Sequence, residues 1–247
     1  MNTETKSNKT ILIIGAGEGN GTAIAKRFAR EGYVACVVRR NAEPLEALVA
    51  SIEAAGGRAR AFAVDARKED AVISLVDQIE REIGPLEVLV FNAGANVPSS
   101  ILDETAQKYF KIWEMACFAG FLCAREAAKR MVKRERGTIL FTGATASMRG
   151  SAKFAAFSGA KHALRALAQS MARELGPRGI HVGHVVIDGM VDTAFIRDNF
   201  PQVYTERMSK DGIMMPEHIA ENYWHLHSQP RDAWTFELDL RPYMETW

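Results

Sequence analysis

Cysteine and long apolar stretches are both scarce in this sequence. Its three cysteines, Cys36, Cys117 and Cys123, do not follow the paired spacing of a metal site and form no even set for disulfides. They suit a reducing compartment. No apolar stretch approaches the ~20 residues that a membrane-spanning helix needs, and residues 1–9 lack the apolar core of a signal peptide. These absences predict a cytoplasmic protein that makes no use of a membrane.

Charge of one sign is not in excess either. The formal net charge is +1, and acidic and apolar residues interrupt the one local basic stretch, 129–136. Without a concentrated positive field, neither nucleic acid nor an anionic membrane is an expected partner. His225 and His227 lie two residues apart, which puts them on different faces of a helix. No cysteine or carboxylate completes a set with them or with His218, so no metal site is predicted.

Strand-like and helix-like patterns alternate along all 247 residues. Such alternation predicts βαβ units and a parallel sheet. We therefore expect a single Rossmann-type α/β domain over 1–247, with a doubly wound, seven-stranded sheet and helices on both faces. Apolar spacing also predicts two separate helices over 103–115 and 117–133, and a long helix over 154–176. The expected strands are 10–14, 33–38, 59–64, 86–91, 138–142, 180–187 and 234–240.

The segment 192–230 is less regular than the rest of the chain. It follows the expected sixth strand and contains three prolines, several methionines and aromatic residues. In open α/β sheets, ligands bind beyond the carboxyl ends of the strands. Two interpretations stay open: a mobile segment that covers a substrate, and a helical excursion that only packs against the domain.

A glycine-rich turn joins the first expected strand to the first helix. It contains Gly15, Gly17, Gly19, Asn20 and Gly21. Glycine permits the tight turn and lets the backbone approach a pyrophosphate, to which the helix N-terminus presents free N–H groups. A glycine motif alone is weak evidence, but here a strand precedes it and a helix follows it. The pattern predicts that the chain binds a nicotinamide dinucleotide.

Arg39 and Arg40 follow the second expected strand, where folds of this kind contact the adenine ribose. Arginine there pairs with a 2′-phosphate and favours NADP, whereas an acid would favour NAD. Glu18, in the glycine turn, opposes this interpretation because its carboxylate would repel the phosphate. We predict NADP as the cofactor, with NAD as the alternative.

Further residues follow the later strands in a recognisable pattern. The run 92–94, Asn-Ala-Gly, follows the fourth expected strand, Asp65 follows the third, Lys161 lies on the long helix and Thr193 follows the sixth strand. With the glycine spacing, they resemble the short-chain dehydrogenase/reductase family over about residues 10–195. The resemblance implies hydride transfer to or from a small carbonyl or alcohol substrate.

The resemblance also implies an assembly and a set of cofactor contacts. The helices at 103–133 and 154–176 would form the interface of a homodimer or homotetramer. The implied dinucleotide-binding residues are Gly15, Gly17, Gly19, Asn20, Gly21, Arg39, Arg40, Asp65, Ala66, Asn92, Ala93, Gly94, Lys161, Gly189, Val191 and Thr193.

The chain departs from the family at the catalytic positions. There a tyrosine exchanges the substrate proton, a serine steadies the substrate oxygen, an asparagine positions a water, and a lysine binds the nicotinamide ribose. The corresponding residues here are Phe157, Ala144, Cys117 and Lys161. Phenylalanine has no titratable proton, and the loss of an acid–base group typically costs about 10²–10⁴-fold in rate. We therefore predict an atypical active site.

Nearby polar residues are candidates to replace the lost groups. Asp188 stands where the family has a proline and is a candidate general base, although a turn or capping role is the simpler interpretation. Lys161 is a candidate proton donor if it is desolvated next to a cationic nicotinamide, although binding of the ribose is the simpler interpretation. The hydroxyls of residues 142, 145, 147 and 158 lie near in sequence, but local capping is their commoner role.

Three hypotheses about function follow. The first is a nicotinamide-dependent oxidoreductase with an altered active site, acting on a carbonyl, alcohol or imine. The second is a catalytically silent dinucleotide-binding protein, either a sensor or the inert partner of an active subunit. The third is an enzyme of another type, such as a lyase, that uses Asp188.

Overall fold

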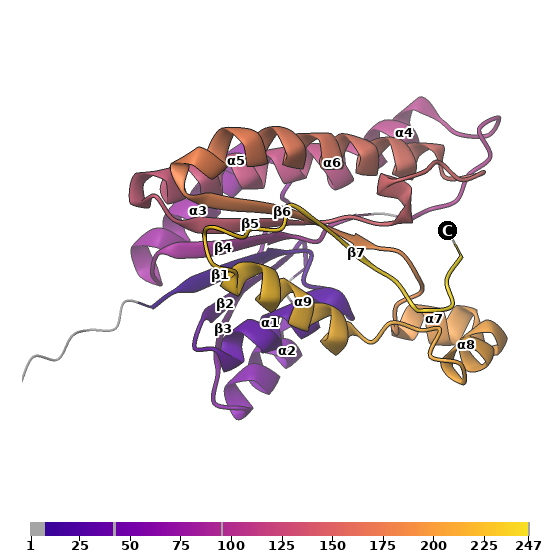
Figure 1. The fold of residues 1–247 in the computed structure, drawn as a ribbon, viewed down its shortest axis with the longest axis horizontal. Helices are drawn as coiled ribbons and strands as arrows, with labels where there is room; N and C mark the ends of the chain where they lie inside the picture. Colours follow the sequence, from indigo (N-terminus) through magenta and orange to yellow (C-terminus); the bar gives the residue numbers. More distant parts are fainter. Residues whose placement is uncertain (1–7, 42, 95, 247) are drawn as a thin grey trace, which may run out of the picture.

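The computed structural model describes residues 8–41, 43–94 and 96–246. In these residues a seven-stranded, all-parallel sheet has the order β3-β2-β1-β4-β5-β6-β7 (Figure 1). The predicted Rossmann-type α/β architecture is confirmed. The strands are β1 (Thr10–Ile14), β2 (Val34–Arg39), β3 (Arg58–Ala63), β4 (Leu86–Phe91), β5 (Gly137–Thr142), β6 (Ile180–Ile187) and β7 (Glu237–Leu240).

Helices cover both faces of the sheet, as Figure 1 shows. The layer with α3, α5 and α6 packs on one face and the layer with α1, α2 and α9 on the other. Central strands β1 and β4 are buried along their whole length, which explains their continuous apolar sequences. The helices are α1 (Asn20–Arg30), α2 (Glu43–Ala54), α3 (Glu69–Glu82), α4 (Ala106–Trp113), α5 (Ala119–Met131), α6 (Ala155–Leu175), α7 (Ala194–Asn199), α8 (Pro201–Met208) and α9 (Pro216–Ser228).

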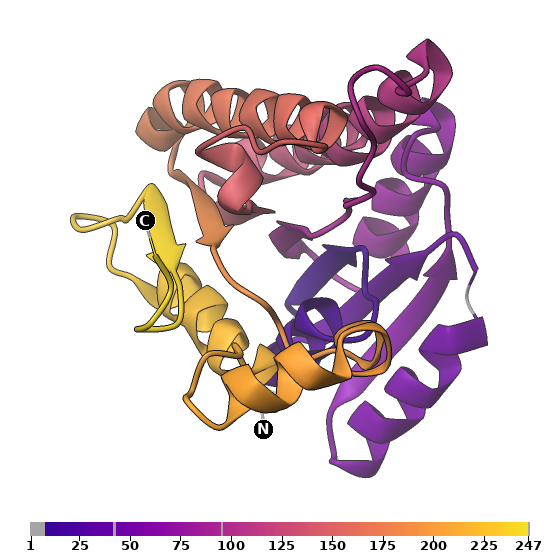
Figure 2. The same cartoon turned by 90° about the vertical axis from the view of Figure 1, so that its right-hand side faces the viewer.

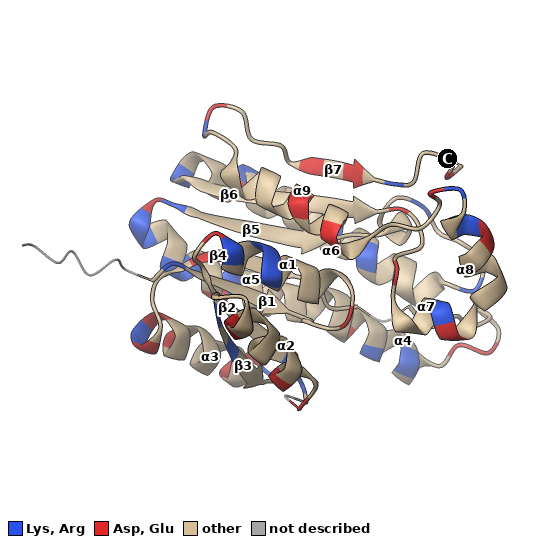
Figure 3. Ribbon diagram, turned by 90° about the horizontal axis from the view of Figure 1, so that it is seen from below, with Lys and Arg blue, Asp and Glu red and all other residues tan. Residues whose placement is uncertain are grey.

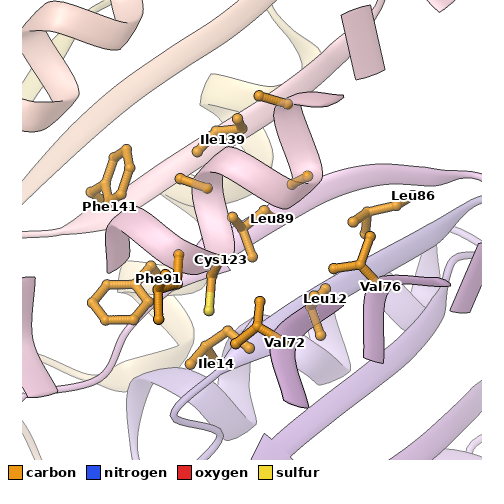
Figure 4. Packing of buried hydrophobic residues seen from close by; sticks show 14 of the residues in the cluster. Leu12, Ile14, Val72, Val76, Leu86, Leu89, Phe91, Cys123, Ile139 and Phe141 are labelled. Carbon is orange, nitrogen blue, oxygen red and sulfur yellow. The ribbon is translucent and has the colours of Figure 1, made fainter. Parts of the chain in front are cut away.

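The core under α3 and α5 holds branched, aromatic and sulfur-containing side chains in close contact. In Figure 4, Cys123 on α5 lies among Leu89 and Phe91 of β4 and Ile14 of β1. Charged residues lie mainly on the helices and loops, whereas the central strands carry few (Figure 3). The charged groups at the carboxyl edge of the sheet therefore come from the segments that follow the strands.

Two predicted boundaries were wrong. The helices expected over 103–115 and 117–133 are not separate, because a π-helical turn, Glu114–Phe118, joins α4 to α5 without a break. A π turn adds one residue to the helical repeat and shifts the apolar face, so its sequence pattern imitates an interruption. The last strand begins at Glu237 and not at Trp234, whose ring stacks on His181 at 4.9 Å.

The segment 192–230 divides into two parts. Helices α7 and α8 lie beyond the carboxyl ends of the strands (Figure 2). Helix α9 instead packs along α1, and its residues Ile219, Tyr223 and Leu226 belong to the core. Only the first part, up to about residue 215, is therefore placed where it could cover a ligand.

His227 connects α9 to the sheet through a neutral imidazole. Its Nε2 lies 2.7 Å from the Tyr33 hydroxyl, and its Nδ1 lies 2.9 Å from the Thr138 hydroxyl. Burial lowers the pKa of this histidine to about 4. Since the unfolded chain accepts the proton near pH 6.5 and the folded chain resists it until about pH 4, acid favours unfolding in that window.

We expect the substitution His227→Gln to weaken this acid sensitivity. Glutamine can hydrogen-bond but does not titrate, so the variant should lose about 2–3 kcal/mol less unfolding free energy than wild type as the pH falls from 6.5 to 4. Denaturant unfolding at several pH values measures the loss. His225→Gln, on the exposed side of the same helix, is the matched control and should behave as wild type. Equal losses in all three proteins would contradict the assignment.

Candidate functional site

A cleft opens at the carboxyl edge of the sheet, the end that faces the viewer in Figure 2. It consists of two adjoining cavities that share Asn92 and Gly94. The first, here called the glycine-turn cavity, has a volume of about 250 Å³ and includes Gly15, Gly17, the end of β2, and residues 64–67, which follow β3. The second, the lysine cavity, has a volume of about 410 Å³ and surrounds Lys161.

The glycine turn lies tightly against neighbouring backbone. Gly15 has φ +88°, and a Cβ there would lie 2.9 Å from the amide nitrogen of Ala93. Gly19 has φ +86°, and a Cβ there would lie 2.9 Å from Thr193 Cγ2, so the turn also touches the segment after β6. No side chain caps the N-terminus of α1. The first turn of this helix is therefore left to bind an anion.

Two arginines contribute to the wall of the glycine-turn cavity. Arg39 ends β2 and Arg40 follows it, and neither has a salt-bridge partner among the residues that the structure describes. Glu18 lines the lysine cavity instead. The carboxylate expected to repel a phosphate is thus part of a different cavity from the two guanidinium groups.

Asp65, at the end of β3, is fixed by an arginine that the sequence analysis did not identify. Nε and Nη2 of Arg67 donate to its carboxylate at 2.9 and 2.7 Å. These bonds hold the pKa of Asp65 down at about 2. The acid therefore stays ionised and oriented at the cavity wall, beside Ala66. The two-residue spacing of Asp65 and Arg67 was the available signal.

Lys161 is buried on α6, and its Nζ donates to the carbonyl of Thr142 at 2.8 Å. Desolvation lowers its pKa to about 8, an effect that Cys117 partly offsets. A Cβ on Gly94 would lie 3.4 Å from the lysine Nζ, so the bare glycine leaves the ammonium room at the point where the two cavities meet.

The side chains one turn before Lys161 and at the end of β5 are apolar. Phe157 and Ala144 both line the lysine cavity, and the Phe157 ring centroid lies 5.8 Å from Lys161 Nζ. Cys117, in the π turn, belongs to the buried cluster that contains Phe157 and Ala160. Burial raises the pKa of its thiol. At the three positions where the resemblance puts polar relay groups, this cavity thus offers no hydroxyl or amide.

Asp188 is held in a network that does not line the lysine cavity. The Thr145 hydroxyl donates to Oδ1, and Oδ2 lies 3.2 Å from Arg241 and 3.5 Å from Arg149. Only 2% of Asp188 is exposed. The neighbouring Gly189 lies close to the C-terminal segment, because a Cβ there would be 2.6 Å from Pro242 Cδ. These contacts match a structural carboxylate that joins three segments.

The other hydroxyls near the cleft also have partners or lie away from it. Thr142 Oγ1 is 2.7 Å from the hydroxyl of Tyr223. Ser147 accepts from the amide of Ala144 at 3.1 Å. Ser158 is buried and does not line the cavity. Of the three, only Thr142 lines the lysine cavity, and its hydroxyl already has a hydrogen-bond partner.

The segment after β6 completes the lysine cavity. Val191 and Thr193 line it, and the Thr193 hydroxyl accepts from the Ile196 amide at 3.3 Å, which caps α7. Asn20 also lines it, and its buried Oδ1 has no partner within the described residues. Asn96 lines the same cavity and was not predicted, because nothing but its closeness to the Asn-Ala-Gly run pointed to it.

No group of three or more His, Cys, Asp and Glu side chains within the described residues is arranged to hold a metal ion. Both ring nitrogens of His227 lie within hydrogen-bond distance of Tyr33 and Thr138, so this histidine does not join His218 and His225 at one site. No helix in the described part of the chain is long and apolar enough to span a membrane.

Comparison with known proteins gives consistent matches. The short chain dehydrogenase family model matches residues 9–203. The chain is 32% identical to 2-(S)-hydroxypropyl-CoM dehydrogenase 3 of Xanthobacter autotrophicus over 87% of each chain. A crystal structure of a short-chain dehydrogenase from Rhodopseudomonas palustris is 47% identical, with a TM-score of 0.82, and the match covers 96% of this chain and 99% of that one. A metagenomic short-chain oxidoreductase in complex with NADP is 25% identical, with a TM-score of 0.82 and coverage of 97% and 99%. This chain belongs to the short-chain dehydrogenase/reductase family.

Proposed function

We propose that this protein is an NADP-dependent oxidoreductase that interconverts a small carbonyl compound and its alcohol. The observation that carries the proposal is the cleft, in which an uncapped helix N-terminus and two arginines without a salt bridge among the described residues adjoin a cavity with a buried lysine. Relatives named as dehydrogenases and reductases support the reaction class. The solved relative in complex with NADP supports the cofactor.

The residues present fit such a cofactor. The glycine turn and the N-terminus of α1 would hold the pyrophosphate, while Asp65 and Ala66 would lie beside the adenine. Asn20 Oδ1 is buried and has no hydrogen-bond partner among the described residues, which leaves it available to accept a hydrogen bond from a bound ligand. Lys161 and Thr193 would take the nicotinamide end. The bound dinucleotide would supply the hydride chemistry.

Arg39 and Arg40 support NADP over NAD. Neither guanidinium group forms a salt bridge within the described residues, although the charge of Arg40 contributes to the lowered pKa of Asp65. Such a pair suits a 2′-phosphate, with which arginine forms charge-assisted hydrogen bonds. Because Glu18 lines the lysine cavity, its carboxylate does not oppose the binding of a phosphate at the two arginines.

We expect Arg39→Ala and Arg40→Ala each to weaken NADPH binding about 10–100-fold, because a hydrogen bond to a charged group contributes about 1.5–3 kcal/mol. Binding of NADH, which lacks the 2′-phosphate, should change little. Titration by nicotinamide fluorescence measures both constants. Arg81→Ala, with a side chain 71% exposed on α3, is the control. Equal weakening for NADPH and NADH would refute the assignment of these arginines.

The reaction would use an atypical proton supply. Phe157 and Ala144 leave the cavity wall without the hydroxyls that the family pattern has there. The same observation is what favours the second candidate, a dinucleotide-binding protein without turnover.

The double substitution Ala144→Ser with Phe157→Tyr should raise carbonyl reduction by at least about 10²-fold, since it returns an acid and an oxygen-binding hydroxyl to the wall. Initial rates on a panel of aldehydes, ketones and diones measure the gain. Phe154→Tyr, at the N-cap of α6 and outside the cavity, is the control. Wild-type protein that binds NADPH but turns over no member of the panel, beside an active double variant, would establish the silent alternative.

We further propose that α7 and α8 cover the substrate. Phe195 is 65% exposed and Phe200 46%, although both are large apolar side chains. Thr193 caps α7 and lines the lysine cavity, so movement of this helix would change the cavity wall. The exposed side chains of Phe195 and Phe200 would suit a substrate with a hydrocarbon or aromatic part.

Helices α4 to α6 are the proposed interface of a homodimer or homotetramer. A groove of about 370 Å³ between α5 and α6 is lined by Phe121, Leu167 and Met171. Phe121 continues an aromatic stack from α4, whose member Phe110 is 58% exposed. Exposed apolar surface of this kind marks an interface.

Size-exclusion chromatography with light scattering should give twice or four times the chain mass of 27.3 kDa. Leu167→Arg should shift the protein to monomer, because it replaces an apolar side chain of the groove with a charged one that would be buried between subunits. The control Val203→Arg changes an exposed residue on α8. A monomeric wild type would exclude this interface.

A further inference from the structure

Within the described residues, two titratable side chains line the lysine cavity, Lys161 and Glu18. Glu18 is exposed in the glycine turn. Thr142 and Thr193 also line the cavity. The Thr142 hydroxyl lies 2.7 Å from the Tyr223 hydroxyl, and the Thr193 hydroxyl accepts from the Ile196 amide. Because aliphatic hydroxyls do not titrate near neutral pH, Lys161 is the buried titratable group at this wall.

The surroundings of Lys161 leave part of its ammonium free. An ammonium has three N–H donors, and one of them goes to the Thr142 carbonyl. No carboxylate forms a salt bridge with Lys161 among the described residues, so no anion fixes the proton on the nitrogen. Phe157 and Gly94 leave the remaining donors beside the cavity.

The titratable neighbours of Lys161 do not compete with it near neutral pH. Burial raises the pKa of the Cys117 thiol in the π turn, so this group stays protonated. Burial lowers the pKa of His184 on β6 to about 4, so its ring stays neutral. The pKa of Lys161 itself, lowered to about 8 by desolvation, lies close to the range in which a general acid works best.

Building on the oxidoreductase function proposed above, we propose that Lys161 is itself the catalytic acid and base of this site. During reduction the carbonyl carbon gains the hydride of the reduced dinucleotide, the C=O π bond breaks, and the oxygen takes a proton from Lys161 Nζ. The products are an alcohol, the oxidised dinucleotide and a neutral amine, which regains its proton from water. In the reverse direction the neutral amine takes the proton of the alcohol.

The variant Lys161→Arg separates this role from cofactor binding. Arginine keeps the positive charge near the nicotinamide end, but with a pKa above 12 it cannot release a proton at neutral pH. We expect NADPH to bind within about threefold of wild type while the reduction of phenanthrenequinone and trifluoroacetophenone falls by at least about 10²-fold. Lys161→Met, which fits an apolar site, should be folded by circular dichroism and equally slow. Lys129→Arg, exposed on α5, is the matched control with wild-type rates.

Two pH profiles complete the test. Wild-type reduction should decline, and alcohol oxidation should rise, around pH 8. In the protein without cofactor, acetic anhydride labelling of Lys161, followed by mass spectrometry from about pH 6 to 10, should have its midpoint near 8 and not near the ordinary value of about 10.4. Full activity in Lys161→Arg, or a midpoint near 10.4, would overturn the role of Lys161 alone. Failure of wild-type protein to bind NADPH would overturn the proposed function as well.

Discussion

The position of the Lys161 ammonium depends on one residue, Thr142, at the end of β5. Its carbonyl accepts from Lys161 on α6 at 2.8 Å, and its hydroxyl lies 2.7 Å from the hydroxyl of Tyr223 on α9. Because α6 packs on one face of the sheet and α9 on the other, Thr142 joins both helical layers at the edge of the cleft. The cation is thus held in place by the packing of the whole domain. Phe157 and Ala144 make one side of the cavity wall apolar.

A buried ammonium without a carboxylate partner is unfavourable for folding, since desolvation acts against the charge. Groups of this kind are concentrated at functional sites. The neighbouring glycine-turn cavity has the opposite character, with the guanidinium groups of Arg39 and Arg40 at an open wall. The cleft therefore combines a cavity with two guanidinium groups, suited to phosphate groups, and a cavity of mixed polar and apolar lining that surrounds a buried ammonium.

Strands and the glycine turn were predictable because their signals are local. Continuous apolar runs mark buried parallel strands, and the spacing of glycines marks the turn whatever the rest of the chain does. The π turn at Glu114–Phe118 was missed because it only shifts a helical phase. The partners of Thr145 and Asp188 could not be predicted, since their network depends on Arg241, which lies more than fifty residues beyond Asp188. Arg67 is a different case, because its two-residue spacing from Asp65 was a sequence signal, although the bidentate contact is evident only in the structure.

The proposed function requires a dinucleotide in the cleft, with its adenosine end at the arginines and its nicotinamide end at Lys161. A crystal structure of the wild-type protein grown with saturating NADPH tests this most directly. We expect density for the 2′-phosphate beside Arg39 and Arg40, the pyrophosphate at the N-terminus of α1, and the nicotinamide in the lysine cavity. Density for the cofactor elsewhere on the protein, or none in the cleft under these conditions, would contradict the account.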